Sequence, residues 1–171
     1  MVKNRAIDEG NIVKKFKNEV QKFIISRHHD YMIVLTFKED VNEITASMIL
    51  SRFIKRMNEC YFGRRSRKSI VVTPILEMNA FHGLHYHVLM QDPRPISNKS
   101  GEKDIKDIIR DNWNNSSPIT RDVYQSAGGS GEWCKVIYDS EGISEYLTKQ
   151  LVYRRPNIID FNNYTTEYRK N

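Results

Sequence analysis

The sequence predicts a single α+β domain, in which a mainly antiparallel sheet of five short strands is flanked by helices. Short β-branched and aromatic runs are interspersed with amphipathic stretches, and the first half follows the order strand, helix, strand, strand. No internal repeat or linker-like composition separates a second domain. At 171 residues the chain is long enough to bury a core. We therefore expect residues 1–171 to form one domain.

The first elements follow from hydrophobic spacing. Apolar residues recur every three or four positions in 11–25, which predicts an amphipathic helix. Residues 30–37, "DYMIVLTF", are typical of a strand. A second helix is predicted over 42–62, where Asn42 or Thr45 can cap the first turn.

A hairpin is predicted next. Residues 69–78, "SIVVTPILEM", form a strand pattern, and Pro74 indicates an edge or a bulge because proline cannot donate to a ladder. Residues 79–83, "NAFHG", form the turn into a strand over 84–90.

The second half is read in the same way. Residues 91–101 have loop composition, and 102–115 predict a polar-faced helix. Residues 121–139 suggest two strands joined by a Gly-Ser turn, and 142–153 form the last clear helix pattern. The Asn-, Thr- and Tyr-rich tail shows no periodicity.

The charge of the chain indicates a polyanionic partner. The net charge is +6 and the isoelectric point is about 9.3. Four cations lie in one connector, "YFGRRSRKS", between a predicted helix and a predicted strand: Arg64, Arg65, Arg67 and Lys68. This connector is either a solvated turn or a loop that binds DNA phosphates.

Other features of the sequence indicate the cellular compartment. No apolar run approaches the roughly 20 residues of a membrane span, and the first residues lack the apolar stretch of a secretory signal. Cys60 and Cys134 stand in no metal-binding or redox spacing. We expect ordinary thiols in a reducing compartment, which is the cytoplasm of a prokaryotic host or the nucleus of a eukaryotic one, and no membrane partner.

Two histidines in "FHGLHYHVLM" suggest a metal site. Alternation along a strand places His85 and His87 on one face, which we expect to be open to solvent. Glu77 precedes His85 by eight residues across the predicted turn, so it can share that face. Two imidazoles and a carboxylate with open positions suit a divalent ion. Mn²⁺ fits this mixed donor set, and Mg²⁺ is the expected cellular ion.

The last predicted helix carries a polar arc beside its buried stripe. At about 100° per residue from Tyr146, Lys149 lies at about −60°, Gln150 at about +40° and Tyr153 at about −20°. The apolar stripe of this helix lies between about 60° and 140° and consists of Ile143, Leu147 and Leu151. Packing of this stripe would turn the arc of Tyr146 toward a neighbouring site.

Three motifs together resemble a known family. "LHYHVLM" (84–90) is similar to the HUH signature, two histidines separated by a bulky residue on a strand. "YLTK" (146–149) resembles the Y-x-x-K signature, and "IVLTF" (33–37) resembles the first motif, of rolling-circle replication initiators (Rep proteins). The three occur in the order of that family and span residues 33–149.

The resemblance implies an HUH nuclease fold with a metal held by His85, His87 and Glu77. It implies that Tyr146 attacks a phosphodiester of single-stranded origin DNA, giving a 5′-phosphotyrosine and a free 3′-hydroxyl that primes replication. Lys149 would offset phosphate charge or hold the phenol in line. No P-loop is found, so a separate helicase is the expected partner, and a homodimer stays open.

Two other functions stay open. Single-strand DNA transposases of the HUH class use a glutamine four residues after the tyrosine, and Gln150 has that spacing from Tyr146. A non-catalytic module of the RNA-recognition type has a related sheet, but it would leave His85 and His87 without a purpose. Tyr153 is a second candidate nucleophile.

Overall fold

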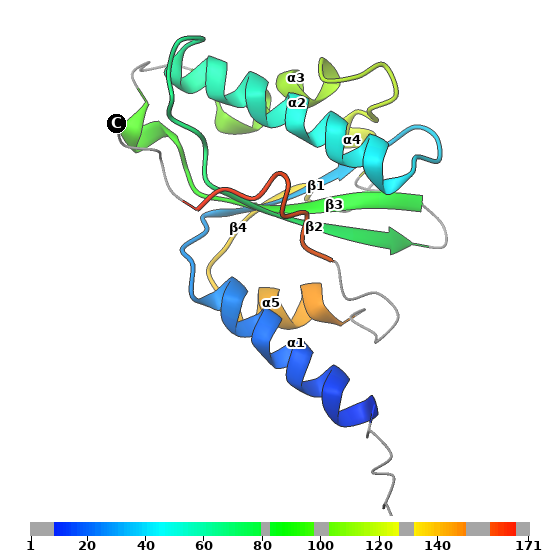
Figure 1. Cartoon of the computed structure of the whole chain (residues 1–171). Coiled ribbons are helices and arrows are strands. Elements are labelled where there is room, and N and C mark those ends of the chain that lie inside the picture. Colours follow the sequence, from blue (N-terminus) through cyan, green and yellow to red (C-terminus); the bar gives the residue numbers. More distant parts are fainter. Residues whose placement is uncertain (1–8, 80–82, 98–102, 127–131, 150–157, 167–171) are drawn as a thin grey trace, which may run out of the picture.

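The chain forms an α+β fold with a four-stranded antiparallel sheet, as seen in a computed structural model that describes residues 9–79, 83–97, 103–126, 132–149 and 158–166 (Figure 1). The strands are β1 Tyr31–Thr36, β2 Val72–Asn79, β3 Gly83–Met90 and β4 Cys134–Val136. The α-helices are α1 Glu9–Ile25, α2 Glu43–Phe62, α3 Ile105–Asn114, α4 Val123–Ser126 and α5 Ser140–Thr148, with a short 3₁₀ turn at Arg94–Ile96.

The sheet separates two layers of helices. Its strand order is β2-β3-β1-β4, so β3 and β1 are central. Figure 1 shows α2 and α3 on one face and α1 and α5 on the other. The larger core lies under α2 and α3, and a smaller core lies under α1 and α5. The two faces of β2 and β3 are therefore both covered, and they carry different residues.

Alternation along β3 assigns its side chains to these faces. Tyr86, Val88 and Met90 pack in the larger core, on the face opposite the two histidines. Leu89 packs in the smaller core, on the same face as His85 and His87. Gly83 has φ of 64°, a left-handed conformation that glycine adopts at no steric cost, at the start of the strand.

Helix α2 begins where the sequence predicts. Asn42 is the N-cap, and its side-chain oxygen accepts a hydrogen bond from the backbone N–H of Thr45 at 2.8 Å. Of the two predicted caps, Asn42 is thus the one used. The helix ends at Gly63, which has φ of 86°. The buried side chains of α2 face the core, so the other side of the helix is exposed to solvent.

Strand β2 lies at an edge of the four-stranded sheet, which confirms the interpretation of Pro74. The segment from Ile158 to Thr165 runs along that edge through isolated bridges rather than a continuous strand. Asp160 N–H donates to the carbonyl of Pro74 at 3.0 Å, and Leu76 N–H donates to the carbonyl of Ile158 at 2.6 Å. Within the described residues the sheet has four strands, so the expected fifth strand is not confirmed.

One predicted strand is wrong. The first part of residues 121–139 forms the short helix α4 instead. Asp122 causes the turn, because its side chain accepts a hydrogen bond from Tyr124 N–H at 3.0 Å and its carbonyl accepts one from Gln125 N–H at 2.9 Å. The second predicted strand of this region is β4.

The last helix begins two residues earlier than predicted. Asp139 caps it by accepting a hydrogen bond from Gly142 N–H at 2.9 Å. The end of the predicted range, 150–153, lies outside the described residues. No helix in the described part of the chain is long and apolar enough to cross a membrane.

Candidate metal centre and nucleophile

The register of β2 and β3 brings three metal-binding side chains together. Glu77 lies directly opposite His85, and Ile75 lies opposite His87. Glu77, His85 and His87 each offer a ligand atom, and these atoms all lie within 4.8 Å of one another. The predicted juxtaposition of the carboxylate and the two imidazoles is therefore present.

The carboxylate of Glu77 holds both imidazoles. Its Oε2 lies 2.8 Å from Nε2 of His87 and 3.5 Å from Nε2 of His85. Hydrogen bonds from His85 and His87 keep the pKa of Glu77 well below its usual range, although burial opposes this shift. The carboxylate is therefore ionised at neutral pH and is ready to accept a cation.

The site is buried, which corrects the expectation of a face open to solvent. His87 is only 3% exposed, and His85 is also buried. The two rings meet edge to face, with centroids 5.1 Å apart. Removal of an imidazole would therefore leave a cavity as well as remove a ligand.

The donor set fits a divalent metal. Two imidazole nitrogens and one carboxylate oxygen converge, which leaves further coordination positions for substrate. Nδ1 of His85 lies 3.5 Å from the carbonyl of Gly83, a long contact on the side of the ring away from Glu77. Among the described residues, Nδ1 of His87 is buried and makes no hydrogen bond.

Tyr146 lies beside the triad, on α5. Its ring meets the ring of His87 at a centroid distance of 5.7 Å and an interplanar angle of 88°. Tyr146 is 44% exposed, so a ligand can reach it from solvent. Nζ of Lys149 lies 3.7 Å from the centroid of the Tyr146 ring. The structure thus places the predicted nucleophile, its lysine and the metal ligands in one cluster.

Contacts with α1 and the sheet fix the rotation of α5. Leu147 is buried in the smaller core, and Ile143 packs against it. Gln21 of α1 donates to the hydroxyl of Thr148 at 2.9 Å, and that hydroxyl donates to the carbonyl of Ser144 at 2.7 Å. Sequence reasoning missed this anchor, since nothing in the pattern of α1 distinguishes Gln21 from a solvent-facing residue.

The basic connector lies away from this cluster. It precedes β2, whereas Glu77 lies five positions after the start of the strand at Val72, a rise of about 17 Å. It also follows α2, which covers the opposite face of the sheet (Figure 1). Arg64, Arg65 and Arg67 are exposed, and Nε of Arg64 is 3.7 Å from the carboxylate of Glu59. The connector and the metal ligands therefore cannot bind the same phosphate.

Two further sequence candidates are not described, and the two other described histidines have partners of their own. Gln150 and Tyr153 lie outside the described residues. His28 is exposed and pairs with Asp30 at 2.9 Å. His29 is buried and bonds to the hydroxyl of Thr73 at 3.0 Å.

No protein-family model, curated protein or solved structure was found to match this chain. The assignment of function therefore depends on the geometry of the site.

Proposed function

We propose that the chain is a rolling-circle replication initiator that nicks and rejoins single-stranded origin DNA in a metal-dependent reaction. The observation that carries this proposal is the position of Tyr146, whose ring lies against His87 of the Glu77–His85–His87 cluster. A half-exposed tyrosine beside a metal-binding triad is suited to attack a phosphate held there. The finer fold prediction, a five-stranded HUH nuclease sheet, belongs to this proposal and is supported by the two histidines on the central strand β3.

Three side chains would bind the metal ion, and a fourth would attack the phosphate. Glu77, His85 and His87 would hold Mn²⁺ or Mg²⁺, which when bound polarises the scissile phosphate. The phenolic oxygen of Tyr146 forms a bond to phosphorus while the bond from phosphorus to the 3′ oxygen breaks. The phenol proton passes to solvent, and the 3′ oxygen takes up a proton and leaves as a hydroxyl.

Lys149 supports this step. The Lys149 ammonium lies over the Tyr146 ring, where it can offset the negative charge of the incoming phosphate. Because one phosphoester bond replaces another, a 3′-hydroxyl can reverse the step without external energy. Rejoining therefore needs the same residues as nicking.

Mass spectrometry of a covalent adduct tests the proposal. The protein is incubated with randomised single-stranded oligonucleotides and Mn²⁺, digested, and searched for nucleotide-bearing peptides, with EDTA as the control. We expect a metal-dependent adduct on the peptide containing Tyr146. Metal-dependent cleavage without any adduct would contradict a tyrosine nucleophile, and absence of both cleavage and adduct would contradict the proposed enzyme.

A further inference from the structure

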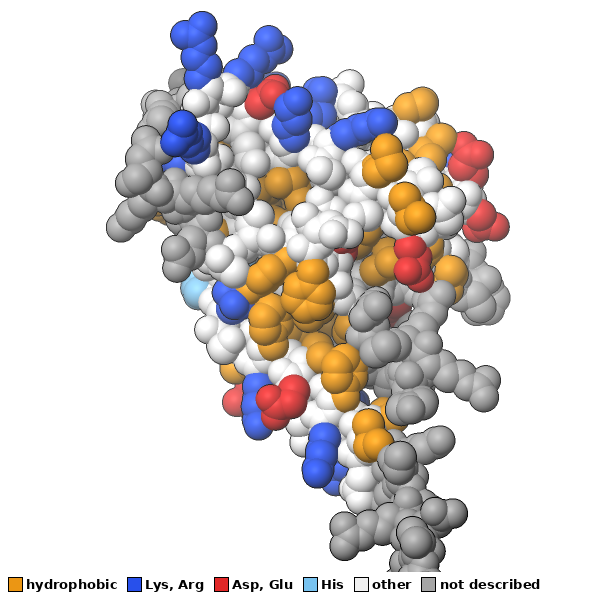
Figure 2. Space-filling view, in the orientation of Figure 1, with side chains coloured by type: hydrophobic (Ala, Val, Ile, Leu, Met, Phe, Trp, Pro, Cys, Tyr) orange, Lys and Arg blue, Asp and Glu red, His pale blue; other side chains and the backbone are white. Residues whose placement is uncertain are grey.

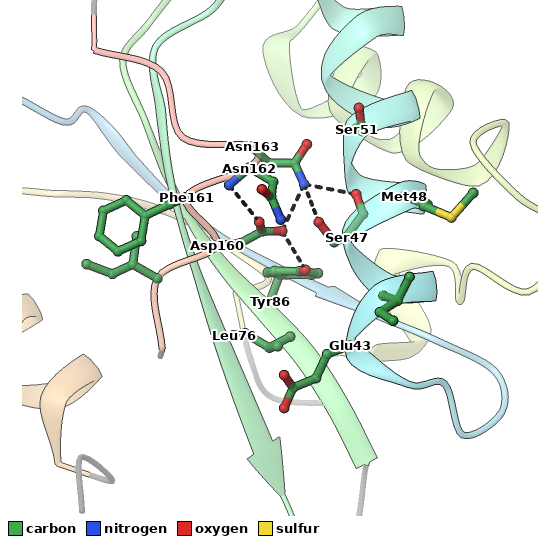
Figure 3. Close-up of a pocket in the computed structure, with 12 residues that line it drawn as sticks. Glu43, Ser47, Met48, Ser51, Leu76, Tyr86, Asp160, Phe161, Asn162 and Asn163 are labelled. Carbon is green, nitrogen blue, oxygen red and sulfur yellow. Dashed lines mark hydrogen bonds between the residues drawn. The ribbon is translucent and has the colours of Figure 1, made fainter. Parts of the chain in front are cut away.

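A hollow of about 630 Å³ lies behind the metal centre, on the other face of the same two strands. Its floor includes Leu76, which adjoins Glu77 in β2, and Tyr86, which lies between His85 and His87 in β3. Figure 3 shows the hollow between the first turns of α2 and the segment around Asp160. The volume falls within the roughly 300–1,000 Å³ of ligand sites.

One wall of the hollow is a hydrogen-bond network centred on the carboxylate of Asp160. Oδ2 of Asp160 accepts hydrogen bonds from the hydroxyl of Tyr86 at 2.9 Å and from Nδ2 of Asn163 at 2.8 Å. Nδ2 of Asn163 also contacts the carbonyl and the hydroxyl of Ser47, both at 2.9 Å (Figure 3). These bonds fix the carboxylate of Asp160 at the wall. Among the described residues it accepts three hydrogen bonds, and only the one from Asn162 N–H reaches Oδ1, which leaves one acceptor direction of Oδ1.

The wall formed by α2 carries exposed apolar side chains. Ile44 and Met48 are 75% and 54% exposed. The ring of Phe161 turns away from the hollow and contacts Phe23 and Tyr164 (Figure 3). The described lining contains the carboxylates of Glu43 and Asp160 but no lysine or arginine. A phosphate would therefore be repelled, whereas a flat, uncharged ring that carries amino hydrogens would find an apolar surface and acceptors.

Cations continue from the hollow along α2. At about 100° per residue, Arg52, Lys55 and Arg56 fall within an arc of about 100°, and all three are exposed. Met48, which lines the hollow, stands one helical turn before Arg52. Figure 2 shows Lys and Arg side chains gathered over the upper part of this face and hydrophobic side chains beside and below them. These three cations form a stripe that leads along α2 toward the basic connector.

We propose that a single-stranded DNA segment lies along α2, with one unstacked base in the hollow and the neighbouring phosphates on the stripe formed by Arg52, Lys55 and Arg56. The acceptor wall at Asp160 selects a base with an exocyclic amino group, such as cytosine, over thymine. The choice of single-stranded DNA as the ligand rests on the proposed function. This segment is distinct from the one cleaved, since the metal centre is on the opposite face of the sheet.

Fluorescence anisotropy in EDTA tests the base site without any cleavage. The probes are an oligothymidine strand and the same strand with one central cytosine. We expect the cytosine strand to bind at least about fivefold more tightly. Met48→Ala should remove this preference, whereas Tyr138→Ala, an exposed aromatic residue after β4, should keep it. Ile44→Glu provides a second variant that cannot disturb packing, and it should weaken binding of the cytosine strand.

The salt dependence tests the stripe separately. Replacement of Arg52, Lys55 and Arg56 by Ala should reduce the slope of log affinity against log salt by roughly 0.7 per lost contact, with the cytosine preference unchanged. The matched control loses three lysines near α3 and β4: Lys103, Lys106 and Lys135. Equal binding of both probes, or a preference that survives both Met48→Ala and Ile44→Glu, would overturn the base site. An unchanged slope would overturn the stripe. None of these results depends on nicking, which is measured separately with Mn²⁺.

Discussion

Glu77 lies opposite His85 in the ladder, yet its carboxylate is closer to His87, at 2.8 Å against 3.5 Å. The carboxylate therefore leans along the strand and bridges two residues of β3 rather than pairing with one. This diagonal contact lies on the side of the cluster that faces Tyr146, because the ring of His87 is the one that Tyr146 meets. The candidate metal site and Tyr146 thus meet at His87.

Tyr146→Phe should abolish the covalent adduct. The substitution deletes only the hydroxyl and keeps the ring against His87, so folding and DNA binding should persist. Mass spectrometry after incubation with single-stranded DNA and Mn²⁺ is the measurement. Tyr138→Phe and Tyr153→Phe are the matched controls and should keep the adduct. An adduct that moves to Tyr153 would show that the Y-x-x-K motif is wrongly assigned.

Metal should stabilise the wild-type fold but not a variant with an altered triad. Mn²⁺ at a hundred times its dissociation constant should add about 2.7 kcal/mol to the free energy of unfolding. Glu77→Gln keeps the shape of the side chain but removes its charge, so the stabilisation and the nicking should both be lost. Thermal unfolding with and without Mn²⁺ measures this effect.

The exposed histidine provides the control for metal binding. His28 pairs with Asp30 away from the triad, so His28→Ala should respond to Mn²⁺ as wild type does. If Glu77→Gln were stabilised to the same degree as wild type, the ion would bind elsewhere.

The connector should affect binding and leave the chemical step unchanged. Replacing Arg64, Arg65 and Arg67 by Ala should weaken single-strand binding at low salt and lower the salt slope by roughly 0.7 per lost contact. Because the connector lies at the far end of β2, nicking at saturating DNA should keep its rate. Titrations at several salt concentrations and single-turnover kinetics measure the two effects. A salt slope equal to that of wild type would make the connector an ordinary solvated turn.

His29 should make stability depend on pH. Burial, followed by the charges of His28 and Arg27, lowers the pKa of His29 from 6.5 to about 4, and Asp30 opposes the shift. As the pH falls, His29 therefore takes up its proton at a higher pH in the unfolded state than in the folded state. The free energy of unfolding should fall by roughly 3 kcal/mol as the pH drops from 6.5 toward 4.

Urea unfolding of metal-free protein at neutral pH and just above pH 4 measures this loss. His29→Gln can keep a hydrogen bond to Thr73 but cannot titrate, so its stability should fall by less. A loss of the same size in both proteins would assign the pH dependence to other groups.

The hairpin that carries the triad could be predicted because its signals are local. The eight-residue separation of Glu77 and His85, the alternation of β3 and the turn before Gly83 agree on one register. The position of β2 at the sheet edge is one of the two possibilities, an edge or a bulge, that Pro74 predicted. Local spacing thus sufficed to place three ligands on one face.

The remainder depends on contacts that the sequence does not display. Val123 and Tyr124 have high strand propensity, but the hydrogen bonds of Asp122 turn them into a helix. Asp160 meets Tyr86 across 74 positions of sequence, from a segment without periodicity. The hollow could not be predicted for this reason, nor could the burial of the histidines, which depends on how α1 and α5 cover the sheet.

The alternation of β3 also limits which changes in chain length the protein can tolerate. A single codon gained or lost between Gly83 and His85 would exchange the two faces of the strand from that point on. The imidazoles would enter the apolar core beneath α2, and the ring of Tyr86 would take their place beside Tyr146. The metal ligands and the floor of the hollow would be lost in one event. Natural variants of this hairpin should therefore differ by substitution, or by length changes confined to the turn.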